Sequence, residues 1–168
     1  MIRAAILTIS DRSFRGERPD ASGPALAEYC VSQSWKIISS RIVPDEKELI
    51  ISALQEWVSC NSIDIILTTG GTGFAPRDIT PEATLEVVEK LAPGLAEAMR
   101  LSSLQKTPHA MLTRGICGIA GRTLIINLPG SPRAAVENLQ VITNVLPHAI
   151  ELLKESPSSE AGHQFDKH

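Results

Sequence analysis

Short apolar runs alternate with segments of helical periodicity along most of the chain. Four runs are rich in β-branched residues and apolar almost throughout, as buried strands are: 2–9, 35–43, 63–69 and 123–128. The helices predicted from apolar spacing and start signals begin at 22 or cover 46–60, 80–91, 95–104 and 132–141. Strands that are apolar on both faces, alternating with helices, predict an α/β fold whose mostly parallel sheet is covered on both faces.

Polar and proline-containing segments separate these elements. Residues 13–21 contain a glycine and a proline among polar side chains and predict a loop. Residues 115–122 predict a short strand and a turn. Pro147 cannot sit comfortably inside a helix, so we expect a break near 143–146 before a last helix that ends near Lys154.

Length and composition limit the classes of protein to consider. A chain of 168 residues predicts one domain, here 1–155, and the polar segment 156–168 is expected to be disordered. A net charge of −3 and 4% aromatic residues argue against a nucleic-acid-binding protein. Three widely spaced cysteines predict free thiols, and no run reaches the roughly 20 apolar residues of a membrane span. With no signal-peptide pattern, we expect a cytoplasmic protein.

A glycine-rich stretch follows the third predicted strand. Its glycines, threonines and aspartate are Gly70, Gly71, Thr72, Gly73, Asp78 and Thr80. Glycine lets the backbone approach a ligand closely. The helix predicted to start at Thr80 would offer unpaired N–H groups and a partial positive charge. The stretch therefore predicts an anion site, and a tight strand-to-helix turn without a ligand is the alternative.

Four predicted strand exits carry polar or glycine residues at Ser10-Asp11, Pro44-Asp45, 69–78 and 127–131. In a parallel sheet these exits share one edge, where α/β proteins bind ligands. Three helix starts, with Ser22, Thr80 and Ser131 as predicted caps, face the same edge. This convergence predicts a site for a polyanion, and carboxylates beside phosphates favour a bound divalent cation.

The common nucleotide-binding and hydrolase motifs do not occur. The glycine run lacks the lysine of GxxxxGK[ST] and does not fit GxGxxG, which disfavours P-loop hydrolysis and dinucleotide redox chemistry. No serine lies in a GxSxG elbow, and no histidine lies near a plausible nucleophile.

The individual acidic residues are each compatible with a purely structural role. Asp45 is equally consistent with capping the helix predicted to follow it. Asp78 is consistent with an ion pair to Arg77, and Asp11 and Asp20 with ordinary loop positions.

One long segment resembles a known signature. TTGGTGFAPRDITPEAT at 68–84 closely resembles the signature of molybdopterin adenylyltransferases, a family that includes bacterial Mog-type proteins and the gephyrin G domain. Further segments agree in order: ILTISDR at 6–12, VPDE at 43–46, KTPHAMLTR at 106–114 and GRTLIINLPGSP at 121–132. The resemblance covers about 2–155 and implies a three-layer α/β/α sandwich, usually assembled as a homotrimer. It also implies Mg²⁺-dependent transfer of AMP from ATP to the terminal phosphate of molybdopterin, release of pyrophosphate and hand-over to a molybdate-inserting protein.

The resemblance also implies roles for single residues. Asp78 and Asp45 would be the catalytic carboxylates and would hold Mg²⁺. The implied nucleotide and substrate contacts are Ser10, Asp11, Gly70, Gly71, Thr72, Gly73, Thr80, Pro129, Gly130 and Ser131. Ser131 departs from the Asn or Gln that members commonly carry there, which puts the nucleotide affinity in doubt. A MoaB-like protein that binds molybdopterin without efficient adenylyl transfer is the alternative to an enzyme, and a scaffold of the gephyrin kind is a third.

Overall fold

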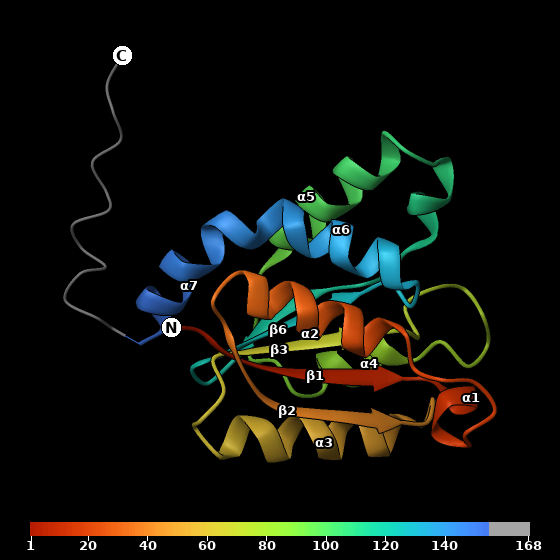
Figure 1. The fold of residues 1–168 in the computed structure, drawn as a ribbon, viewed down its shortest axis with the longest axis horizontal. Helices are drawn as coiled ribbons and strands as arrows, with labels where there is room; N and C mark the ends of the chain where they lie inside the picture. Colours follow the sequence, from red (N-terminus) through yellow and green to blue (C-terminus); the bar gives the residue numbers. More distant parts are fainter. Residues whose placement is uncertain (155–168) are drawn as a thin grey trace.

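A computed structural model describes residues 1–154, so the segment expected to be disordered, 156–168, lies outside the described residues. Within them, six strands form one sheet in the order β2-β1-β3-β6-β5-β4 (Figure 1). The strands are β1 (Arg3–Ile9), β2 (Lys36–Val43), β3 (Ile65–Thr69), β4 (Lys90–Leu91), β5 (Cys117–Ala120) and β6 (Thr123–Leu128). The helices are α1 (Asp11–Phe14), α2 (Ser22–Ser32), α3 (Lys47–Ser59), α4 (Thr80–Leu85), α5 (Pro93–Leu104), η1 (Pro108–Leu112), α6 (Pro132–Ile142), η2 (Thr143–Val145) and α7 (Leu146–Leu153). None of the helices in residues 1–154 is both long and apolar enough to cross a bilayer.

Four neighbouring strands, β2, β1, β3 and β6, run parallel and end at the same level. Thr69 of β3 pairs with Thr8 of β1 on one side and with Leu128 of β6 on the other, while Ile9 pairs with Val43 of β2. Strands β5 and β4 complete the sheet with antiparallel pairings. The segments that leave the four parallel strands therefore start side by side, at one edge of the sheet.

The alternation of side chains along the strands explains the layers. On β1, Ala4 and Ile6 pack into a core with α2, α5, α6 and α7, whereas Ala5 and Leu7 pack into a second core with α3 and α4. Figure 1 shows α2, α6 and α7 on one side of the sheet and α3 on the other. Both faces of β1, β3 and β6 are apolar because both are covered, and the predicted α/β/α sandwich is confirmed. The expectation of a buried strand is wrong for β2, which lies at the edge of the sheet and carries exposed and polar residues.

The helix predicted at 80–91 is wrong in its second half. Helix α4 stops early, and the chain then joins the sheet as the edge strand β4. The Glu89 N–H donates to the Ile119 carbonyl at 2.8 Å. Gly118 makes room for this crossing, because a Cβ added there would lie 2.7 Å from Val88 Cγ1. Pairing with a distant strand thus outweighs the local helical pattern.

The loop predicted at 13–21 is preceded by one helical turn, α1, that overlaps its start. Ser10 caps this turn, because its hydroxyl accepts a hydrogen bond from Ser13 N at 3.2 Å. The prediction that Ser22 caps α2 is wrong. Asp20 Oδ1 accepts the first two N–H groups of α2 instead, at 3.1 and 3.0 Å.

The two other predicted caps have opposite outcomes. Ser131 does cap α6, accepting from Ala134 N at 3.4 Å. Thr80 does not cap α4; its hydroxyl turns back and donates to the Gly70 carbonyl at 2.8 Å. The predicted break before the last helix is present as the short 3-10 helix η2.

Candidate functional site

A pocket of about 630 Å³ opens at the carboxyl edge of the sheet. It lies between the strand exits and the starts of α2 and α6, and we call it the main pocket. Six of the residues predicted from the sequence line it: Ser10, Asp45, Gly70, Gly71, Gly130 and Ser131. The structure therefore gathers residues from all four strand exits around one cavity, as the parallel sheet requires.

The wall formed by Gly70 and Gly71 depends on the absence of side chains. Both have positive φ, +103° and +64°. A Cβ on Gly70 would lie 2.2 Å from the Ile9 carbonyl oxygen, and a Cβ on Gly71 would lie 2.3 Å from Thr80 Oγ1. Only glycine allows the backbone to approach its neighbours so closely in this conformation. We call residues 70–78 the glycine loop.

A buried chain of hydrogen bonds holds the start of the glycine loop. Asn127 Nδ2 donates to Thr68 Oγ1 and to Thr84 Oγ1, both at 2.9 Å. The Thr84 hydroxyl donates to the Thr80 carbonyl, and the Thr80 hydroxyl to the Gly70 carbonyl, both at 2.8 Å. Because each hydroxyl in this buried chain has partners, β6, α4 and the loop are fixed relative to one another.

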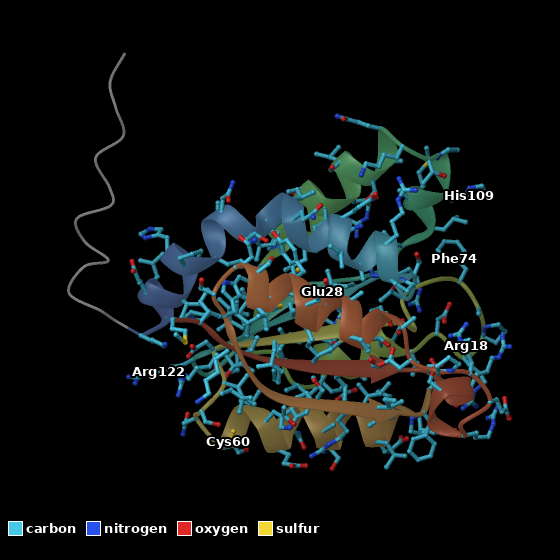
Figure 2. The ribbon with its side chains drawn as sticks, viewed as in Figure 1. Arg18, Glu28, Cys60, Phe74, His109 and Arg122 are labelled. Carbon is cyan, nitrogen blue, oxygen red and sulfur yellow. The ribbon has the colours of Figure 1, made fainter. Side chains whose placement is uncertain are left out.

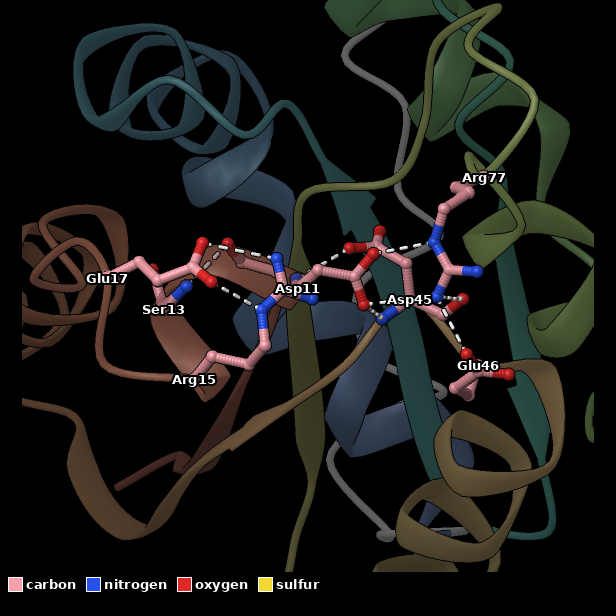
Figure 3. Close-up of polar contacts among 8 residues, drawn as sticks. Asp11, Ser13, Arg15, Glu17, Asp45, Glu46 and Arg77 are labelled. Atoms are coloured by element: carbon pink, nitrogen blue, oxygen red, sulfur yellow. Dashed lines mark hydrogen bonds and ion pairs between the residues drawn. The ribbon is translucent and has the colours of Figure 1, made fainter.

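Asp11 and Asp45 bind each other's backbone (Figure 3). The Asp11 N–H donates to Asp45 Oδ2 at 2.8 Å, and the Asp45 N–H donates to Asp11 Oδ1 at 3.1 Å. Arg77 bridges from the far side, donating from Nε to Asp11 Oδ2 at 2.6 Å and from Nη2 to Glu46 Oε1 at 2.7 Å. Asp45 thus does not cap α3, and Arg77 pairs with Asp11 rather than with Asp78.

The surroundings of the two carboxylates shift their pKa values in opposite directions. The Arg77 guanidinium holds the pKa of Asp11 below its ordinary value. Burial raises the pKa of Asp45, and the negative charges of Asp11 and Asp78 raise it further. Asp45 is therefore a carboxylate, facing the main pocket, whose ionised form a cation would stabilise.

Asp78 lies outside the lining of the main pocket. It lines a second hollow of about 300 Å³ together with Gly73, Phe74, Ala75, Glu82 and Arg114. The two carboxylates flank the glycine loop: Asp45 Oδ1 would be 3.3 Å from a Cβ on Gly71, and Asp78 Oδ2 would be 2.9 Å from a Cβ on Gly73. Figure 2 shows Phe74 and Arg18 at this same end of the molecule.

Four other predicted residues support the pocket without lining it. Asp11 orients Asp45, and Thr80 holds the glycine loop. The Pro129 carbonyl accepts the Thr69 hydroxyl at 2.7 Å. The carbonyl of Thr72 accepts Arg114 N at 2.8 Å.

The donor groups fit a magnesium ion shared with phosphates. No group of three or more Asp, Glu, His or Cys side chains among the described residues is arranged to hold a metal unaided. Mg²⁺ ordinarily keeps waters and takes only one or two carboxylates, with substrate phosphates completing the coordination. Asp45, half-buried and with its charged form destabilised by neighbouring negative charge, suits that role.

Asp20, for which an ordinary loop position was the favoured alternative, belongs to the site, and two further residues, Arg18 and Arg114, were given no role from the sequence. Asp20 closes one side of the main pocket, where its Oδ2 accepts the Thr8 hydroxyl at 2.7 Å. Arg18 lines the same pocket. Arg114 donates hydrogen bonds to the Gly73 and Asp78 carbonyls of the glycine loop. Arg114 lies in the segment KTPHAMLTR, which carried the family resemblance but had no chemical role assigned to it.

Comparisons with known proteins identify the family of the chain. The family model described as a probable molybdopterin binding domain matches residues 5–148. The chain is 46% identical over 159 residues to the molybdenum cofactor synthesis protein cinnamon of Drosophila melanogaster, covering 94% of this chain and 26% of that protein. The chain thus spans about a quarter of that much longer relative.

Relatives of similar length give the same family. The chain is 40% identical over 154 residues to a molybdopterin adenylyltransferase of Helicobacter pylori, covering 90% of this chain and 88% of that protein. The crystal structure of the molybdopterin biosynthesis enzyme MoaB of Thermus thermophilus matches with a TM-score of 0.88 at 50% identity, covering 94% and 99% of the two chains. The chain therefore belongs to the molybdopterin binding domain family.

Proposed function

We propose that the chain is a molybdopterin adenylyltransferase, which transfers AMP from ATP to the terminal phosphate of molybdopterin. The observation that carries the proposal is the glycine loop flanked by two carboxylates at the carboxyl edge of the sheet. Relatives named for this reaction cover nearly the whole chain at 40% identity. They favour an enzyme over a protein that only binds molybdopterin.

The reaction needs little covalent help from the protein. An oxygen of the molybdopterin phosphate attacks the α-phosphorus of ATP, a new P–O bond forms, and the bond to the bridging oxygen of pyrophosphate breaks. The attacking oxygen is already ionised, so no general base is required. The difficulty is bringing two anions together, which makes positioning and electrostatic stabilisation the main contributions of the protein.

The glycine loop supplies donors for the phosphates. The N–H groups of Gly71, Thr72 and Gly73 donate to no backbone carbonyl among the described residues. They are therefore available to phosphate oxygens, as is the N–H of Arg133 in α6, since Pro132 has none and the N–H groups of Ala134 and Ala135 donate to Ser131. Ser10 borders the same pocket from β1.

Asp45 and Asp78 would hold Mg²⁺, directly or through water, and the ion would neutralise charge on the phosphates of ATP. Asp11 keeps Asp45 in place through the reciprocal backbone bonds. Arg77 is engaged by Asp11 and Glu46 and so limits the repulsion among the acidic groups.

The assembly proposed from the family resemblance is a homotrimer in the cytoplasm that hands its product to a molybdate-inserting protein. Cys30 and Cys117 are buried free thiols, and free thiols suit a reducing compartment. Burial raises the pKa of each of these two thiols to about 12. Light scattering of the purified protein at micromolar concentration tests the trimer. Three times the chain mass is expected, and a monomer mass would refute the assembly.

Pyrophosphate release in the presence of molybdopterin, ATP and Mg²⁺ tests the activity. Asp78→Asn is expected to lower the rate by about 100-fold or more, because it removes a charged group at the reacting phosphates. Glu86→Gln is the matched control, since Glu86 pairs only with Lys47 at the surface, and its rate should equal that of the unaltered protein. Binding of molybdopterin without any pyrophosphate release would instead identify a binding protein.

A further inference from the structure

Arg114 makes four polar contacts with the glycine loop and the helix that follows it. Its backbone N–H donates to the Thr72 carbonyl at 2.8 Å. Its Nε donates to the Gly73 carbonyl and its Nη2 to the Asp78 carbonyl, both at 2.7 Å. Its Nη1 donates to Glu82 of α4. One side chain thus joins both ends of the segment 73–78 and ties it to α4.

The segment 73–78 is held from outside by two arginines, because Arg77, within it, also reaches Asp11, the Asp45 carbonyl and Glu46 through its side chain. It belongs to no helix or strand. Within it, the Asp78 N–H donates to the Ala75 carbonyl at 2.9 Å, and the Ala75 N–H donates to Asp78 Oδ2 at 2.9 Å. These two bonds orient the Asp78 carboxylate relative to the segment. Arg77 ties the segment to the exits of β1 and β2 through an exposed side chain, whereas Arg114 holds the backbone at both ends of the segment, including Asp78 itself.

The contact geometry requires a guanidinium. Arginine presents five N–H donors in a rigid plane, and here three of them reach three acceptors on two different structural elements. A lysine ammonium would keep the charge but could not span the Gly73 and Asp78 carbonyls in this arrangement. Glu82 is the ion-pair partner of Arg114. Its second oxygen, Oε2, is buried without a hydrogen-bond partner among the described residues, so the carboxylate depends on the guanidinium for charge compensation.

We propose that Arg114 is a positioning residue, which acts on adenylyl transfer through Asp78 by holding segment 73–78 in place. This inference rests on the proposed function, because it assumes that Asp78 acts on the phosphates. Arg114 itself need not touch the substrates. Its loss should therefore lower the rate of the chemical step while leaving ATP binding in the main pocket nearly unchanged.

Arg114→Lys tests the inference, with Arg41→Lys as the matched control. Arg41 also pairs with a carboxylate, that of Glu56, but it contacts α3 rather than the glycine loop. In pyrophosphate-release assays, Arg114→Lys should lower kcat at least about tenfold and change KM for ATP by less than about threefold. Arg41→Lys should change neither. A rise in KM with unchanged kcat would overturn the proposal.

A double variant separates positioning from a general structural effect. If Arg114 acts through Asp78, then Arg114→Lys should cost nothing further in an Asp78→Asn background, measured by single-turnover kinetics with enzyme in excess. A merely structural role would instead give a second, additive loss in the double variant. Additive losses would therefore contradict the inference.

Hydrogen exchange gives a readout that does not depend on activity. In Arg114→Lys, backbone amides of segment 73–78 should exchange at least about tenfold faster than in the unaltered protein, while amides of β3 and β6 stay unchanged. Equal exchange in the two proteins would overturn the inference even if the rate fell. If segment 73–78 exchanges faster in Arg114→Lys but the unaltered protein releases no pyrophosphate, the role of Arg114 in holding the segment is supported. Only the proposed function is then refuted.

Discussion

At the scale of single residues, the site depends on positions where the backbone must come close to other atoms. Gly70 and Gly71 could be predicted as important, because glycines between a strand and a helix commonly mark such positions. The reason they are needed is tertiary: the Ile9 carbonyl and the Thr80 hydroxyl occupy the space that a side chain would fill. The sequence pattern contains neither contact.

Gly70→Ala should destabilise the protein and impair its activity. A Cβ there would lie 2.2 Å from a backbone oxygen and would require a strained positive φ, so we expect a loss of about 1–3 kcal/mol in the free energy of unfolding. Urea denaturation measures it. Gly94→Ala is the control, because nothing lies within 4 Å of its added Cβ, and a change within about 1 kcal/mol is expected. Equal effects of the two substitutions would contradict the steric account.

Sequence reasoning found some residues of the site and not others for a physical reason. Asp45 and Ser131 follow predicted strands directly, so the shared edge of a parallel sheet brings them together. Arg114 reaches the glycine loop across 36 positions to Asp78, through carbonyl groups that every residue carries. Nothing in the residue types of the loop signals that contact. The sequence prediction groups Asp78 with Asp45, whereas in the structure the two carboxylates line different hollows.

At the scale of elements, the four parallel strands were predictable, whereas the edge strand β4 and the end of the helix before it were not. The central strands are apolar on both faces because helices cover both, and that pattern is local. The helix predicted at 80–91 is too long because the chain after α4 pairs with β5, which is about 30 residues away in the chain. The helical periodicity of a segment does not show that part of it pairs with a distant strand.

Helix α6 offers a test of the capping interaction and of the departure at Ser131. Ser131→Ala should lower the free energy of unfolding by about 0.5–1 kcal/mol, since the cap to Ala134 N is lost. Ser131→Asn should keep the stability because asparagine caps equally well. If the Ser131 side chain also contacts the nucleotide, both substitutions should alter KM for ATP. Ser131→Ala should raise it. Equal stability of all three proteins would refute the cap.

At the scale of the whole molecule, a buried charge joins the start of β1 to the end of α7, at the edge of the sheet opposite the site. Asp64 accepts hydrogen bonds from the backbone and side chain of Arg3 at 2.8 and 2.7 Å and from Lys154 Nζ at 2.8 Å. Its side chain is 1% exposed, so burial opposes its ionisation; the hydrogen bonds from Arg3 and Lys154 outweigh burial and lower its pKa. Asp64 therefore stabilises the fold in its charged form.

Asp64→Asn should destabilise the protein in a pH-dependent way. At pH 7 we expect a loss of about 1–3 kcal/mol, kept modest because Arg3 and Lys154 are partly exposed. The contribution of a carboxylate with a lowered pKa is present above its ordinary value of 3.8 and is lost as the pH falls through the folded-state value. The difference between the two proteins in urea denaturation should therefore shrink in acid. A constant difference from pH 7 to the acid limit of folding would contradict it.

The transfer of a labelled phosphorus atom tests the central claim most directly. The purified protein is incubated with molybdopterin, Mg²⁺ and ATP labelled at either the α- or the γ-phosphate. Adenylyl transfer predicts that the α-label appears in a pterin-containing product and the γ-label in an equal amount of pyrophosphate. Asp78→Asn should lower the rate of both about 100-fold or more. Recovery of the α-label only as ATP or free AMP, with none joined to the pterin, would contradict the account.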